Sequence, residues 1–278
     1  MNPCGWRNGA LRSVCVGFVV GHRHLLRLPA TRKWNEVVEL LVGGAELETI
    51  AGAAAEAAES SLPRESKDPA LVRAFWLLTQ IPLAARTKDF DGGLRKLGIE
   101  TGPSPGLVEV VGALTEAIDR HVGRTGGRTD LGEMAQLAAA ESLSSVVGRD
   151  LPGLFGTTPD DVKLAIGRLS GKKRFADLAR DFFSRLTFRC LDYYLSRELS
   201  NHVGPERRFR SIREHTEFDS ALDLHCRETS RILKEYAAEW FSKKNFEKAL
   251  TPDEAGRFAS SAFGKIRSEL RKRRDADG

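Results

Sequence analysis

Residues 175–202 read FADLARDFFSRLTFRCLDYYLSRELSNH, a stretch that contains no glycine or proline. Its apolar side chains recur at spacings of three and four residues, which places them on faces of a helix. At 3.6 residues per turn the pattern predicts a helix of about seven or eight turns. Two apolar rows cover most of its circumference, so the helix needs neighbours on at least two sides and is expected at the centre of the protein. The rows are Ala179, Phe183, Leu186, Cys190 and Tyr194, and Leu178, Phe182, Phe188, Leu191, Leu195 and Leu199.

The remainder of this helix carries a polar strip, which is expected to be a narrow solvated face. Within the strip, Asp181 precedes Arg185 by four residues, an orientation that stabilises a helix by about 0.2–0.5 kcal/mol. Gly204 and Pro205 predict the end of the helix, because glycine suits a left-handed cap and proline cannot continue a helix. The strip consists of Asp177, Asp181, Arg185, Arg189, Asp192 and Ser196.

Composition favours a soluble helical protein with a mildly basic surface. The chain has 278 residues, 41% of them hydrophobic, and a formal net charge of +5. It can therefore bury a substantial core, and its charge permits an acidic partner or nucleic acid without requiring one. The four cysteines show no CxxC spacing, which favours a reducing cytoplasm over a disulfide framework. No apolar run approaches the length of a membrane span.

The fold class predicted from these patterns is all-α. Outside residues 14–20 the strand signal is nearly absent, and amphipathic segments follow one another with short connections. We expect a bundle of about nine or ten helices around residues 175–202. Asp68 and Pro69 predict a capped helix start, and apolar positions from Phe218 to Trp240 predict one long helix.

Glycine-rich residues 123–128, GRTGGR, are the candidate boundary between two layers. The predicted organisation is a short irregular or strand-like arm at 1–30, an N-terminal helical layer at 31–122 and a C-terminal helical bundle at 129–278. The alternative is one continuous domain over 31–278.

Histidine and carboxylate residues near the C-terminal helices are weak candidates for a metal site. His202 ends the predicted central helix, whereas His225 and Glu228 lie three residues apart on the next one. Facing helices of a bundle build metal sites from such pairs. However, His225 falls on the apolar stripe of its helix, where a buried neutral imidazole with a structural role is the ordinary case. We therefore predict no metal ligand and no cofactor.

Basic residues cluster in three places that are candidate contacts for nucleic acid or an acidic partner. Charge runs of this kind are usually solvated helix ends, and nearby glutamates dilute the second cluster. Phe209 lies among the arginines of that cluster and is a candidate for stacking on a base. The clusters are Lys172, Lys173 and Arg174; Arg207, Arg208, Arg210 and Arg213; and Arg271, Lys272, Arg273 and Arg274.

The catalytic signature HExxH and a glycine-rich nucleotide loop after a strand are missing from the chain. The first functional hypothesis is therefore a non-enzymatic, cytoplasmic helical adaptor or complex subunit that acts through protein–protein contacts. The second is a basic helical subunit that binds nucleic acid through the clusters above. The third is a metal-dependent enzyme that uses His202, His225 and Glu228.

Overall fold

The computed structural model describes residues 32–57, 68–152, 156–199, 202–204 and 206–277. The arm expected at 1–30 lies outside the described residues. Within them the chain is helical, apart from turns and one isolated bridge between Val203 and Phe209. The predicted all-α class is confirmed. None of the helices in the described part of the chain has both the length and the apolar character needed to cross a bilayer.

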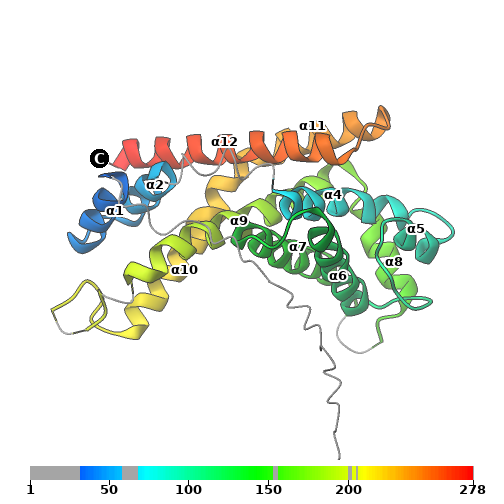
Figure 1. Cartoon of the computed structure of the whole chain (residues 1–278), viewed down its shortest axis with the longest axis horizontal. Helices are drawn as coiled ribbons and strands as arrows, with labels where there is room; N and C mark the ends of the chain where they lie inside the picture. The colour runs from blue at the N-terminus through cyan, green and yellow to red at the C-terminus, as the bar shows by residue number, and fades with distance from the viewer. Residues whose placement is uncertain (1–31, 58–67, 153–155, 200–201, 205, 278) are drawn as a thin grey trace, which may run out of the picture.

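The helices follow one another with short connections, and α12 runs along one edge of the molecule from α4 to α2, where the C-terminus lies near α1 (Figure 1). In chain order the elements are α1 (Arg32–Val42), α2 (Leu47–Ala57), α4 (Pro69–Ala84), α5 (Phe90–Lys96), α6 (Leu107–Thr125), α7 (Asp130–Gly148), α8 (Pro159–Arg168), α9 (Lys172–Leu199), α10 (Ile212–Thr229), the 3₁₀ turn η3 (Ser230–Ile232), α11 (Leu233–Phe246) and α12 (Pro252–Asp277).

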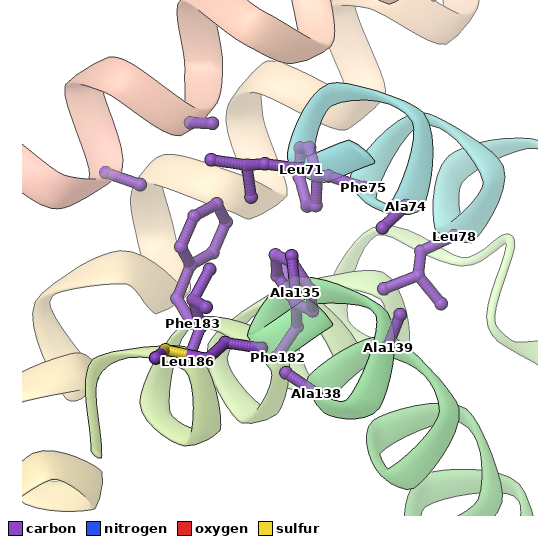
Figure 2. Close-up of a cluster of buried hydrophobic side chains, with 14 of the residues drawn as sticks. Leu71, Ala74, Phe75, Leu78, Ala135, Ala138, Ala139, Phe182, Phe183 and Leu186 are labelled. Atoms are coloured by element: carbon purple, nitrogen blue, oxygen red, sulfur yellow. The ribbon is translucent and has the colours of Figure 1, made fainter. Parts of the chain in front are cut away.

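The central helix predicted from residues 175–202 is α9, which packs against α2, α7, α10 and α11. Figure 2 shows its aromatic side chains Phe182 and Phe183 directed toward Phe75 of α4, with alanines of α7 beside them. The ring centroids of Phe75 and Phe182 are 5.6 Å apart, and those of Phe75 and Phe183 are 5.1 Å apart. Phe75 also stacks on Phe258 of α12 at 5.1 Å. One phenylalanine thus joins α4, α9 and α12 in the core.

The polar strip of α9 is only partly the solvated face that was expected, because five of its six residues are half-buried and Ser196 is exposed. Arg185 Nε donates to Asp181 Oδ1 at 2.6 Å, as the spacing predicted. Both Arg185 and Arg189 also bond to Glu141 of α7, with Arg185 Nη1 at 3.2 Å from Glu141 Oε2. Arg185 and Arg189 of the strip thus link α9 to α7 through ion pairs that are partly exposed to solvent.

Asp68 caps α4 as predicted and also ties this helix to α7. Its Oδ1 accepts from the backbone N–H groups of Ala70 and Leu71 at 2.9 and 3.0 Å. Its Oδ2 accepts from the hydroxyl of Thr129 at 2.5 Å, and Thr129 in turn caps α7 by accepting from Gly132 N at 2.9 Å. The two helix starts are thereby held together, and the caps satisfy two N-terminal N–H groups of α4 and one of α7.

The long helix predicted across Phe218 and Trp240 is interrupted, so that prediction was wrong. The chain leaves α10 at Thr229, passes through η3 and continues as α11. Two hydroxyls explain the break: Thr229 Oγ1 donates to the His225 carbonyl at 3.1 Å, and Ser230 Oγ donates to the Cys226 carbonyl at 2.6 Å. Such back-bonding competes with the helical hydrogen bonds and bends helices.

The helices on the two sides of residues 123–128 share one hydrophobic cluster of buried residues. Contacts also cross this point, because α7 packs on α4 and α6, while α12 packs on α2 and α4. Gly126 follows the last residue of α6 and has a φ of 137°, a backbone angle that residues other than glycine rarely adopt. The division of the chain into an N-terminal layer and a C-terminal bundle at this glycine stays a prediction.

Candidate functional site: a cationic cleft beside the central helix

The three basic clusters of the sequence lie at different places in the fold. The first opens α9, and the second follows the other end of this helix. Because α9 has 28 residues, these two clusters are separated by about 40 Å at 1.5 Å per residue. The third cluster lies at the end of α12, beside α2. The first two clusters therefore cannot act on one small ligand.

The turn that carries the second cluster does not present Phe209 for base stacking, so that expectation was wrong. The ring is 2% exposed and packs against Phe218 at a centroid distance of 5.5 Å. The guanidinium carbon of Arg208 lies 5.3 Å from the centroid of the Phe209 ring. Arg207 and Arg210 are exposed, whereas Arg213 Nε bonds to Glu217 Oε1 at 2.8 Å.

The third cluster is tied into the fold at its last positions. Arg273 Nε lies 3.3 Å from Glu269 Oε1 on the same helix. Arg274 Nη1 lies 2.7 Å from Glu56 Oε2 of α2. The hydrogen bond from Arg274 lowers the pKa of Glu56 below its usual value, against the effect of burial. The ion pair between Arg274 and Glu56 thus fastens this end of α12 to α2. Lys272 of the same cluster is exposed.

The three metal candidates are not assembled into a site. His225 is 5% exposed, and its Nδ1 lies 3.7 Å from Glu48 Oε1 of α2. Glu228 instead pairs with Arg231 at 2.9 Å, and His202 belongs to the turn after α9. Across the described ranges, no group of three or more His, Cys, Asp or Glu side chains is placed to hold a metal ion.

The thiol beside His225 lies in an environment that disfavours the thiolate. Cys226 is fully buried, and burial raises the pKa of its thiol far above the ordinary value, with the nearby Asp223 adding to the rise. A reactive cysteine needs an exposed, electropositive setting that favours the thiolate. Cys226 is therefore a packing residue.

A cleft of about 310 Å³ lies where α9 meets the C-terminal end of α7 and the start of α11. Its walls carry five cationic side chains and two carboxylates. The cations come from four different segments of the chain, whereas both carboxylates belong to α9. A volume of this size is at the lower end of the ~300–1,000 Å³ typical of small-molecule sites. The lining residues are Val146, Arg149, Arg174, Asp177, Arg180, Asp181, Ser184, Arg227 and Lys234.

Both carboxylates of the cleft are already engaged. Asp177 Oδ1 lies 2.8 Å from Lys234 Nζ, and Asp181 accepts the bond from Arg185 described above. Outside the lining, Asp150 pairs with Arg174, and Asp223 pairs with Arg227 at 2.8 Å. Ion pairs thus hold most of the wall in place.

Two arginines of the cleft have backbone partners instead. Arg180 Nη2 donates to the carbonyl of Arg227 at 2.9 Å, and Arg149 Nε donates to the carbonyl of Ser145 at 3.2 Å. In the part of the chain that the structure describes, neither guanidinium has a carboxylate within ion-pairing distance. Each guanidinium has five N–H donors, so both retain donors for an anion.

A second cleft, of about 550 Å³, adjoins the first along α9. The two share the Lys234–Asp177 ion pair, which forms the partition between them. The exposed side chains of Lys172 and Lys173 line this outer cleft. Of the three predicted basic clusters, the first therefore opens onto the cationic surface beside α9, with Arg174 lining the inner cleft and the lysines lining the outer one.

The sequence patterns did not single out Arg149, Arg180, Ser184, Arg227 or Lys234. Arg180 and Ser184 are four residues apart on α9 and share a face with Asp177 and Asp181, which was a signal available in the sequence. Arg149, Arg227 and Lys234 carried no such signal, because their approach to this face depends on how three other segments pack.

The arrangement defines an all-α protein with a cationic cleft built around one buried helix. Comparison with protein-family models, with curated proteins and with solved structures finds no match for this chain.

Proposed function

We propose that the protein is a non-enzymatic helical adaptor or complex subunit whose cationic cleft binds an acidic segment of a partner protein. The observation that carries this proposal is the meeting of five cations from four segments in one cleft, where the two lining carboxylates are already bonded. Cysteine usage supports a cytoplasmic setting for this role.

The preformed geometry supports recognition of an anion over a merely solvated surface. Arg174, Arg227 and Lys234 are each held by a carboxylate, so their side chains are ordered before any ligand arrives. Arg149 and Arg180 supply the donors that carboxylates do not use. Preorganised cations bind with a smaller entropic cost than mobile ones do.

A fluorescent peptide rich in glutamate tests the proposal by anisotropy at increasing salt. The double variant Arg149→Glu with Arg180→Glu is expected to lose binding. The matched control is Arg95→Glu with Lys96→Glu, which reverses two exposed charges on α5 outside the cleft. If the two double variants bind the glutamate-rich peptide with equal affinity, the cleft is not the binding site for an acidic segment.

A labelled single-stranded oligonucleotide tests the second hypothesis in the same assay. Binding that falls steeply with salt, survives the cleft variant and is lost on reversing Arg207, Arg208 and Arg210 would favour a nucleic-acid-binding subunit instead. Arg207 and Arg210 are exposed at that turn, so reversing their charges changes the surface that an oligonucleotide would contact.

A further inference from the structure

A buried hydroxyl lies in the wall of the cationic cleft. Ser184 of α9 is 3% exposed and lines the cleft, and its Oγ has no hydrogen-bond partner among the described residues. Leaving a buried polar group without a hydrogen bond is unfavourable, because the group has lost its water partners. A ligand atom that accepts a hydrogen bond from this oxygen recovers that loss.

Several helical hydroxyls elsewhere in the protein donate to a carbonyl of their own helix. Ser260 Oγ donates to the carbonyl four residues earlier at 3.1 Å, and Ser220 Oγ does the same at 2.8 Å. Ser184 makes no such bond. Three other buried hydroxyl oxygens, those of Thr101, Ser142 and Thr187, are also without partners in the described chain, but none of them lines the cleft. Ser184 is the one that combines an unused hydroxyl with a cationic setting.

We infer that this cleft receives a phosphorylated serine or threonine of the acidic partner segment, with Arg149 and Arg180 pairing its phosphoryl oxygens and Ser184 donating to one of them. The inference rests on the proposed function and specifies the group that the cleft recognises. It concerns binding only, and no bond to phosphorus is made or broken.

The charge and donor count of the cleft match a phosphoryl group better than a carboxylate. A phosphorylated side chain carries about −1.5 to −2 charges at pH 7 and three strong acceptor oxygens. Three of the five lining cations are already paired with Asp150, Asp177 and Asp223, so the two guanidinium groups of Arg149 and Arg180 leave an excess of two positive charges, which one carboxylate would only half match. Guanidinium groups bind phosphate in a bidentate manner, and two of them plus a hydroxyl supply donors for all three oxygens.

The test compares two capped glycine peptides that differ at one position, which is phosphoserine in one and glutamate in the other. Calorimetry with the full chain is expected to give binding of the phosphoserine peptide that is about tenfold tighter, or more, than binding of the glutamate peptide. Ser184→Ala is expected to weaken the phosphoserine peptide by about tenfold, as for a hydrogen bond to a charged group.

Ser142→Ala is the matched control, because it removes a buried, unpartnered hydroxyl from α7 that is outside the cleft. Its affinity for the phosphoserine peptide is expected to equal that of the unmodified protein. Thermal unfolding of both alanine variants verifies that they fold, and the loss of an unsatisfied hydroxyl predicts no fall in stability.

The outcomes separate this inference from the proposed function. Equal affinity for the two peptides, with both lost in the double variant of Arg149 and Arg180, overturns phosphoryl recognition and leaves the acidic-segment proposal standing. Equal effects of Ser184→Ala and Ser142→Ala also overturn it. If neither peptide binds and the glutamate-rich peptide fails as well, both proposals fall.

Discussion

The Nη2 group of Arg180 donates a hydrogen bond to the backbone carbonyl of Arg227 at 2.9 Å. This bond joins the N-terminal half of α9 to the last turn of α10, where carbonyl groups have no partner within their own helix. It also fixes the guanidinium at the wall of the cationic cleft. One arginine thus serves the packing of two helices and the electrostatics of the cleft.

Replacing Arg180 is expected to separate these two roles. Arg180→Met keeps the apolar stem and removes every donor, so the affinity for the glutamate-rich peptide is expected to fall by about tenfold. The free energy of unfolding is expected to fall by only about 0.5–1.5 kcal/mol, the typical worth of one hydrogen bond. Anisotropy and urea denaturation measure the two quantities. A large loss of stability with unchanged affinity would assign Arg180 to packing alone.

The aromatic cluster predicts a strong dependence of stability on Phe75. Its side chain is fully buried and contacts rings of both α9 and α12. Phe75→Ala is expected to lower the free energy of unfolding by about 3–5 kcal/mol, because it leaves a cavity that rigid helices cannot close. Chemical denaturation measures this, and Val108→Ala, at a side chain 87% exposed, is the control expected to change little. A similar effect of both substitutions would contradict the packing described here.

Replacing either of two helical glycines by alanine is expected to change the stability of the protein, but in opposite directions. A Cβ on Gly52 of α2 would lie 2.8 Å from Cβ of Arg274, so Gly52→Ala pushes α12 away. Its expected cost is about 1–3 kcal/mol, as for overpacking in a core. At Gly112 of α6 nothing lies within 4 Å of the added atom. Gly112→Ala is therefore expected to stabilise the protein by up to about 1 kcal/mol.

Thermal denaturation of the two variants at one pH measures whether Gly52→Ala lowers and Gly112→Ala raises the unfolding temperature. The Glu56–Arg274 ion pair gives a second readout, because displacement of α12 breaks it. If Gly52→Ala proves as harmless as Gly112→Ala, the close approach of α12 to α2 is refuted.

A pair of carboxyl groups between α9 and α10 predicts a pH effect. Burial raises the pKa of Asp192, and the charge of Asp219 raises it further, against opposing contributions from His215 and Arg189. Burial likewise raises the pKa of Asp219, while His215 lowers it. A carboxyl group with a raised folded-state pKa binds protons more tightly in the native state, so it contributes stability at low pH that is lost as pH rises through that pKa.

Asp192→Asn is therefore expected to raise the unfolding temperature at neutral pH by a few degrees. The difference from the unmodified protein should shrink as the pH falls and Asp192 is protonated in the folded state. Calorimetric scans over a pH series measure this, with the exposed Glu36→Gln of α1 as the control. A variant that is less stable than the unmodified protein at neutral pH would show that the ionised carboxylate of Asp192 is needed.

Individual helices could be predicted because their signals are local. The apolar rows of α9 and the cap at Asp68 depend on residues a few positions apart, and both are found in the structure. The predictions that failed concerned what lies next to a helix. The polar strip of α9 resembled a solvated face because no local pattern shows that Glu141 approaches Arg185 and Arg189. Phe209 resembled an exposed ring because its neighbours in the chain are arginines.

By itself the sequence determined that this protein is all-α and that the segment from Phe175 to Leu199 is part of a buried helix at its centre, because hydrophobic periodicity is a property of one segment. Only the tertiary structure decided which charges meet. Arg149, Arg180, Arg227 and Lys234 belong to separate segments, and the last two lie on either side of η3. Their convergence follows from helix packing, which depends on contacts between residues far apart in the chain.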